Sequence, residues 1–199
     1  MHWNPYFYRG SRVLCSLSLL GIFFFTTVPS DTLETPHFNN VGCAAEAAFT
    51  QGSDLRSIDS LIRIFYESLS FPEGKSPDWD RFRPLFASAT SPCIRMTIDI
   101  VMEMDREGFI AFFGGRVEKG TLKSFEEKEI GRTTEIYGSL AQIFSTYEKR
   151  MNLADGGKPT RGINGFQLFF NNNRWWISSI AWQDEIPKEP IPQKYVRPS

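Results

Sequence analysis

The C-terminal half of the chain contains four long segments with the composition of β-strands, and this feature constrains the fold most. These segments span residues 125–137, 140–150, 160–170 and 174–182. Gly138 separates the first pair and the asparagines at 171–173 separate the last pair. Both residue types tolerate the positive φ of tight turns. Because short turns join strands that run antiparallel, we expect a meander in which each strand pairs with the next.

Two amphipathic helices are predicted before these strands. In the first, apolar residues recur at steps of three and four between Leu55 and Leu69, and Ser53 is placed to cap its start. In the other, Asp105 can cap a helix that runs to about residue 116 and carries apolar Phe109 and Phe113.

The region between these two helices predicts a shorter helix and a strand. The short helix opens at Pro77, where the missing N–H of proline has no cost. Pro84 should kink or tighten it, because a proline in a helix removes a hydrogen bond. Residues 94–102 are β-branched and apolar, which is typical of a strand.

Helices followed by a meander are typical of α+β domains. The sequence therefore predicts three N-terminal helices packed on one face of a curved antiparallel sheet, within a domain spanning residues 53–186. Hydrophobic residues make up 41% of the chain and aromatic residues 15%, which is enough apolar material for a core. Gly131, in the middle of residues 125–137, predicts a bulge or bend.

The first 30 residues form a separate segment. Arg9 and Arg12 precede an apolar run at residues 13–25, and Val28 and Ser30 suit signal peptidase cleavage before residue 31. The run is shorter than the roughly 20 residues that span a bilayer. The pattern predicts a cleaved secretory signal peptide and an exported protein, periplasmic or secreted. The alternative is an uncleaved segment that anchors the protein to a membrane.

Two further segments flank the predicted domain. Residues 31–52 are read as an irregular lead-in, and residues 187–199 as a proline-rich tail that is extended, either free or laid on the surface. Without residues 1–30, the chain carries 20 basic and 23 acidic side chains, since that segment holds two arginines and no acids. The absence of a basic excess or stripe argues against a nucleic-acid partner.

Two cysteines remain after the signal peptide, which contains Cys15. In an oxidising compartment Cys43 and Cys93 can pair, and two unrelated thiols are the alternative. Two cysteines without nearby histidines do not make a metal site. The sequence predicts no metal and no cofactor.

Several segments resemble the nuclear transport factor 2-like (SnoaL-like) superfamily, in a bacterial branch of unassigned function. They are residues 78–86 (DWDRFRPLF), 125–130 (FEEKEI), 141–148 (AQIFSTYE), 161–168 (RGINGFQL) and 174–182 (RWWISSIAW). The resemblance covers residues 53–186 and implies a cone, in which a bent sheet wraps the first helix and opens to a pocket. Pro84 and residues 92–104 depart from the family pattern. The superfamily includes isomerases, cyclases, dehydratases and transport adaptors, so the resemblance implies a fold rather than an activity.

Histidine is absent from the predicted domain. The only two in the chain are His2 and His37, in the signal and the lead-in. The usual neutral-pH base is therefore missing, and histidine metal sites are excluded. The same absence argues against Ser-His-Asp and Cys-His nucleophile systems. Dehydratases of the superfamily that use a His–Asp pair are not matched.

An isomerase-like mechanism needs only a carboxylate base and donors in an apolar pocket. Tyr66 could supply a donor, and the candidate acids are Asp99, Glu148 and Asp184. The alternative is that Tyr66 has a solvated hydroxyl and that the acids are solvated strand-end charges. The acidic run at residues 126–129 is likewise interpreted as a solvated edge.

Strand alternation supplies the pocket candidates, because residues two apart share a face. On this basis Trp176 and Trp182 are expected on the same face. The predicted pocket residues are Tyr66, Tyr147, Asn164, Gln167, Trp176 and Trp182. The alternative for each of them is ordinary packing in the core or a dimer face. Both faces of residues 160–170 and 174–182 are apolar, and superfamily members often dimerise through the convex sheet face, so we predict a homodimer.

These observations leave two hypotheses for function. The first is an exported ligand-binding or accessory domain without catalysis, with a small apolar ligand. The second is an isomerase- or cyclase-type enzyme acting on a small apolar substrate. A buried acid with a raised pKa beside a tyrosine or a second acid, inside the cone, would favour the enzyme.

Overall fold

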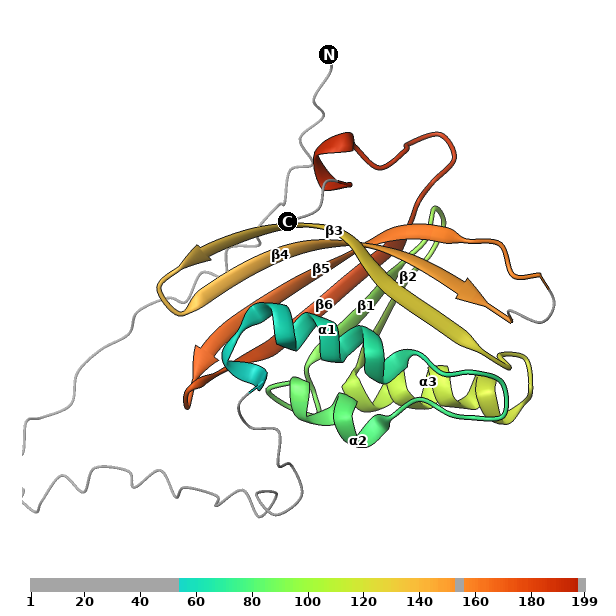
Figure 1. The fold of residues 1–199 in the computed structure, drawn as a ribbon, viewed down its shortest axis with the longest axis horizontal. Coiled ribbons are helices and arrows are strands. Elements are labelled where there is room, and N and C mark those ends of the chain that lie inside the picture. The colour runs from blue at the N-terminus through green and yellow to red at the C-terminus, as the bar shows by residue number, and fades with distance from the viewer. Residues whose placement is uncertain (1–53, 153–155, 197–199) are drawn as a thin grey trace, which may run out of the picture. The chain divides into compact units, whose positions relative to one another are not determined.

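The computed structural model describes residues 54–152 and 156–196 (Figure 1). The signal peptide and lead-in predicted for residues 1–52 lie outside the described residues. The α-helices are α1 (Ile58–Leu69), α2 (Trp79–Phe82) and α3 (Arg106–Glu118). The strands are β1 (Pro92–Met96), β2 (Val101–Asp105), β3 (Phe125–Tyr137), β4 (Leu140–Met151), β5 (Thr160–Asn171) and β6 (Arg174–Asp184).

The six strands form one curved, unclosed sheet in the order β2-β1-β6-β5-β4-β3. The three helices lie on its concave side, with α1 running across the middle strands (Figure 1). Every neighbouring pair is antiparallel except β1 and β6, which run parallel with Cys93 opposite Ile180. The predicted α+β architecture is confirmed, and the sheet departs from the purely antiparallel expectation at this one pair.

The long first helix starts later than predicted. A 3₁₀ turn, η1 (Asp54–Arg56), precedes it, and Ser57 rather than Ser53 caps it by accepting a hydrogen bond from the Ser60 N–H at 3.1 Å. The cap of α3 is the predicted one, since the Asp105 carboxylate accepts from the Gly108 N–H at 2.7 Å.

The second helix is shorter than predicted. Asp78 caps α2, so Pro77 lies outside the helix rather than at its first position. After Phe82 the chain tightens into a 3₁₀ turn, η2 (Arg83–Leu85). This turn contains Pro84, where tightening was expected because proline removes the helical hydrogen bond.

The single strand predicted at residues 94–102 is wrong. The structure has a hairpin there, β1 and β2, closed by a hydrogen bond from the Thr97 N–H to the Ile100 carbonyl at 2.8 Å. The apolar run hides the turn because it contains neither glycine nor proline between the two strands.

The meander matches the prediction closely. A register shift between Glu129 and Gly131 on β3 agrees with the bulge expected at Gly131. A second shift lies on β6 opposite Gln167 and Leu168, which pair with Ser179 and Ile177 and leave Ser178 as the extra residue. The sequence analysis did not predict this second bulge.

Aromatic side chains fill much of the space between the helices and the sheet. The ring of Phe65 on α1 meets Phe166 on β5 edge-on at 5.0 Å and lies 5.6 Å from Phe82. Such pairs are worth about 0.5–1.5 kcal/mol each beyond the area they bury. This packing fixes α1 against the concave face.

The tail lies against the convex face of the sheet. It ends in the 3₁₀ turn η4 (Gln193–Tyr195), where the Tyr195 ring stacks on Phe144 at 5.5 Å. The Thr146 hydroxyl donates to the Tyr195 carbonyl at 2.6 Å. Of the two alternatives for the tail, the described residues are therefore laid on the surface. The homodimer expected through this face remains a prediction.

Candidate functional site

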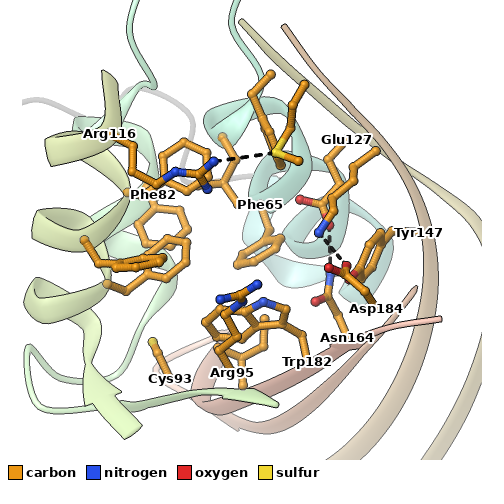
Figure 2. Close-up of a pocket in the computed structure, with 18 residues that line it drawn as sticks. Phe65, Phe82, Cys93, Arg95, Arg116, Glu127, Tyr147, Asn164, Trp182 and Asp184 are labelled. Carbon is orange, nitrogen blue, oxygen red and sulfur yellow. Dashed lines mark hydrogen bonds and ion pairs between the residues drawn. The ribbon is translucent and has the colours of Figure 1, made fainter. Parts of the chain in front are cut away.

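A cavity of about 170 Å³ lies between the concave face of the sheet and the helices (Figure 2). It is open to solvent on one side. Much of its wall is aromatic, formed by Phe65, Phe82, Phe109, Phe112, Phe113, Phe125 and Trp182. An engineered apolar cavity of about 150 Å³ holds benzene, so this space suits a molecule built on a single ring.

Strand alternation explains which polar groups reach the cavity. Phe125 and Glu127 on β3 point the same way, as do Tyr147 and Lys149 on β4. The other polar lining residues on the strands are Arg95, Asn164 and Asp184. Helix α3 adds Arg116.

Glu127 has the most unusual environment of these groups. Its Oε1 accepts one long hydrogen bond, from Asn164 Nδ2 at 3.4 Å. No cation in the described residues forms an ion pair with its carboxylate within 4.0 Å. Burial raises the pKa of Glu127 from 4.5 to about 7, opposed by the nearby Lys149 ammonium and the Asn164 hydrogen bond. Both protonation states are therefore populated at neutral pH.

Tyr147 and Lys149 share the carboxylate of Asp184. The Tyr147 hydroxyl donates to Asp184 Oδ1 at 2.5 Å, and the Lys149 ammonium pairs with the same oxygen. Burial raises the pKa of Tyr147 well above its ordinary value, and the charge of Asp184 adds to the effect. Tyr147 therefore stays protonated and its hydrogen is committed to Asp184.

The close approach of Tyr147 depends on Gly162, its cross-strand partner on β5. A Cβ at Gly162 would lie 2.2 Å from the Tyr147 hydroxyl oxygen and 2.5 Å from the Gln183 carbonyl oxygen. Only glycine leaves room for the phenol at this place.

A second polar network lies beneath the cavity floor. The Tyr66 hydroxyl is 2.7 Å from Ser145 Oγ and accepts from Asn164 Nδ2 at 3.1 Å. Ser145 Oγ donates to Glu129, whose carboxylate receives both arms of Arg132 at 2.7 and 2.8 Å. This network holds Asn164, which links it to Glu127.

The structure brings together three of the six predicted pocket residues. Tyr147, Asn164 and Trp182 line the cavity. Tyr66 lies behind it, in contact with Asn164. Of the acids proposed for an isomerase-like reaction, Asp184 belongs to the cavity wall. Glu148 instead pairs with surface cations, and Asp99 lies in the β1–β2 turn.

Gln167 and Trp176 lie on the other side of the sheet. Gln167 lies three residues after Asn164 on β5, so the two side chains point to opposite faces of the sheet. Gln167 faces a hollow bordered by the tail. Trp176 donates its Nε1–H to the Asn171 carbonyl at 3.0 Å, and the Arg174 guanidinium stacks 3.7 Å from its ring centre. The expectation that Trp176 shares a face with Trp182 is wrong, because the bulge at Ser178 inverts the alternation between them.

Glu127 was not among the predicted site residues. The acidic run at residues 126–129 is not uniformly solvated, since Glu127 lines the cavity and Glu129 joins the buried network. The signal that could have found both is the inward-facing Phe125, because residues two and four positions later share its face.

Cys93 also lines the cavity, with a fully buried side chain. Burial raises the pKa of its thiol to about 12. The proposed partner Cys43 lies outside the described residues, so the disulfide remains a prediction. Within residues 54–152 and 156–196, no three His, Cys, Asp or Glu side chains gather closely enough to hold a metal ion.

No family model and no curated protein matches this sequence. Solved structures do match its fold. A domain of unknown function with a cystatin-like fold from Nostoc punctiforme aligns with a TM-score of 0.51 at 13% identity, over 69% of this chain and 80% of that one.

Two further matches carry names of enzymes. A protein from Novosphingobium aromaticivorans, provisionally named a scytalone dehydratase, aligns with a TM-score of 0.51 at 9% identity, over 73% of this chain and 93% of that one. A dehydratase of the NTF2-like family from Streptomyces avermitilis, also provisionally named, aligns at 0.50 and 10% identity, over 70% and 97%. These likenesses confirm the predicted nuclear transport factor 2-like fold. At such identities they carry no activity over to this chain.

Proposed function

We propose that the cavity binds a small, largely apolar molecule and that Glu127 transfers a proton to or from it. The observation that carries this proposal is a carboxyl group in an aromatic cavity with no ion-pair partner among the described residues. A general acid–base group works best when its pKa lies near the operating pH. The Glu127 pKa of about 7 meets that condition in a domain that lacks histidine.

The reaction class that fits is proton abstraction next to a carbonyl. The Glu127 carboxylate would take a proton from the carbon, and the resulting carboxylic acid would return it at another carbon of the same molecule. The Lys149 ammonium lines the same cavity and pairs with Asp184, and its remaining N–H groups could donate to the substrate oxygen on which negative charge develops. The aromatic wall would limit the access of water to the carbanion.

A second candidate is ligand binding without catalysis. Tyr147 favours it, because its hydroxyl hydrogen is already donated to Asp184 and is not free to polarise a substrate carbonyl. In this case the Glu127 carboxyl would serve as a hydrogen-bonding group for the ligand.

One assay separates the two candidates. The isomerisation of 3-cyclohexen-1-one to its conjugated isomer has a ring that fits the cavity and an ultraviolet signal. We expect Glu127→Gln to slow it by about 100-fold or more, the usual contribution of a general base. Glu126→Gln is the matched control, since Glu126 is the exposed neighbour on the same strand.

Equal rates for the two variants would contradict the role of Glu127. Binding of the enone, seen by ligand-observed NMR, without turnover by the wild type would favour the non-catalytic candidate.

We also propose that the protein is exported, which is supported only by the signal-like pattern of residues 1–30. None of the helices in the described ranges is long and apolar enough to cross a membrane. N-terminal sequencing of the protein from its own host should find Asp31 first. A chain that retains residues 1–30 and sediments with membranes would instead support the anchor.

A further inference from the structure

We propose that the ligand of this cavity carries a carboxylate, which Arg95 and Arg116 bind. This inference rests on the proposed function, because it takes the aromatic cavity as the ligand site. It adds the chemical class of the ligand and the two side chains that recognise it.

Both arginines line the cavity, and they come from different elements. Arg95 lies on β1, two residues after the inward-facing Cys93, and Arg116 lies in the last turn of α3. Figure 2 shows both guanidinium groups turned toward the space around Phe65. Both side chains are partly buried, so their charges lie against an aromatic surface rather than in bulk water.

These two arginines differ from most others in the described residues. Seven arginines form ion pairs with carboxylates: Arg63, Arg81, Arg83, Arg106, Arg132, Arg150 and Arg161. Neither Arg95 nor Arg116 has such a pair in the same set of residues. Within the described ranges, the Arg116 guanidinium makes a weak hydrogen bond to Met151 Sδ at 3.9 Å and has no other side-chain hydrogen bond.

The cavity is consequently cationic although the whole chain has a net charge of −1. Lys149 is neutralised by Asp184, which leaves two guanidinium groups and the half-protonated Glu127. Partly desolvated cations without counterions are unfavourable, and an anionic ligand group would offset that cost.

The shape of the guanidinium groups and the size of the cavity favour a carboxylate attached to a ring. A guanidinium presents a planar fork that matches the two oxygens of a carboxylate. The phenylalanines provide the surface for the ring, and the volume of about 170 Å³ limits the ligand to about one ring.

The test compares a charged ligand with its neutral isostere. We expect benzoate to bind the purified wild-type protein at least tenfold more tightly than benzamide in isothermal titration calorimetry, as for a charge-assisted hydrogen bond. Arg95→Gln and Arg116→Gln should each weaken benzoate about tenfold and leave benzamide unchanged. The control Arg150→Gln alters an exposed arginine on β4 and should bind benzoate within about twofold of wild type.

Equal affinity for benzoate and benzamide would overturn the proposal, as would unchanged benzoate affinity in both arginine variants. It would also be overturned if neither benzoate nor cyclohexanecarboxylate bound. Tighter binding of phenyl phosphate than of benzoate would refute the carboxylate assignment. The wild-type comparison needs no variant, so a misfolded arginine variant does not obscure the outcome.

The experiment also separates this inference from the proposed function. Benzoate has no carbonyl-activated C–H bond, so its binding does not depend on proton transfer. Glu127→Gln should therefore retain benzoate while losing isomerisation. If benzoate fails to bind but 3-cyclohexen-1-one is still isomerised, the carboxylate inference falls and the proposed function stands.

Discussion

Replacing Glu127 with glutamine should make the domain more stable at neutral and alkaline pH, although it removes the proposed catalytic group. The cause is the environment of the carboxylate, which the fold encloses without an ion-pair partner from the described residues. Burial raises its pKa from 4.5 to about 7. Active-site groups commonly lower the stability of the fold that holds them.

The sign and size of the effect follow from proton linkage. Between the two pKa values the folded state holds the Glu127 proton and the unfolded state releases it, so wild-type stability falls as the pH rises through this window. The difference between 4.5 and about 7 corresponds to a cost of roughly 3 kcal/mol once the pH exceeds 7. Below pH 4.5 both states are protonated and the cost disappears.

Glutamine does not titrate, so the variant lacks this cost. The free energy of unfolding of Glu127→Gln minus that of wild type should therefore increase by roughly 2–3 kcal/mol between pH 5 and pH 8. Urea denaturation followed by tryptophan fluorescence at several pH values measures it. Glu126→Gln should show a constant difference, because Glu126 is exposed. A flat profile for Glu127→Gln as well would refute a partly buried carboxylate without an ion-pair partner.

Three other changes test the surroundings of the site. Gly162→Ala would force a Cβ to within 2.2 Å of the Tyr147 hydroxyl and should destabilise the fold by about 2 kcal/mol or more in urea melts. Gly165→Ala, whose Cβ would lie 3.6 Å from its nearest neighbour, should be tolerated, and equal effects would count against the close packing. Tyr66→Phe removes the hydrogen bonds that the Tyr66 hydroxyl makes with Ser145 and Asn164 and should cost about 1–3 kcal/mol of thermal stability, whereas an unchanged melting temperature would mean that the network is not formed. Deleting residues 187–199 uncovers the apolar convex face and should increase self-association in sedimentation equilibrium, and an unaltered profile would argue against that face as the predicted dimer surface.

The meander could be predicted because its turns are local and chemically marked. Gly138, Asn172 and Asn173 adopt φ values of 57°, 50° and 61°, the conformation that these residue types tolerate best. The strands between such turns are long, so their ends were placed within a few residues. The fold class follows from this part of the chain.

The β1–β2 hairpin and the parallel pairing of β1 with β6 could not be predicted in the same way. Residues 97–100 turn without a glycine or proline, held by hydrogen bonds between Thr97 and Ile100. Pairing with β6 joins segments far apart in the sequence, and no local pattern encodes it. This pairing brings Arg95 beside Trp182 and so completes the cavity wall.

Strand alternation alone could not identify all the pocket residues. Alternation along β5 places Asn164 and Gln167 on opposite faces, but it does not indicate which face encloses the cavity. On β6 it failed, because one extra residue at Ser178 moves Trp176 to the convex side while Trp182 stays inside. A single bulge reverses every assignment beyond it, so parity is reliable only within a stretch of unbroken pairing.

The two inward-facing acids of β3 show why Glu127 stands out. Glu129 has the partners expected of a structural carboxylate. Arg132 donates two short hydrogen bonds to it and Ser145 donates a third. Glu127, two residues earlier on the same face, receives only the long hydrogen bond from Asn164 and opens to the cavity. A carboxylate needed only for packing would be expected to have partners of the first kind, because an unpaired buried charge is costly. The contrast within one strand therefore argues that the missing partner of Glu127 is a ligand.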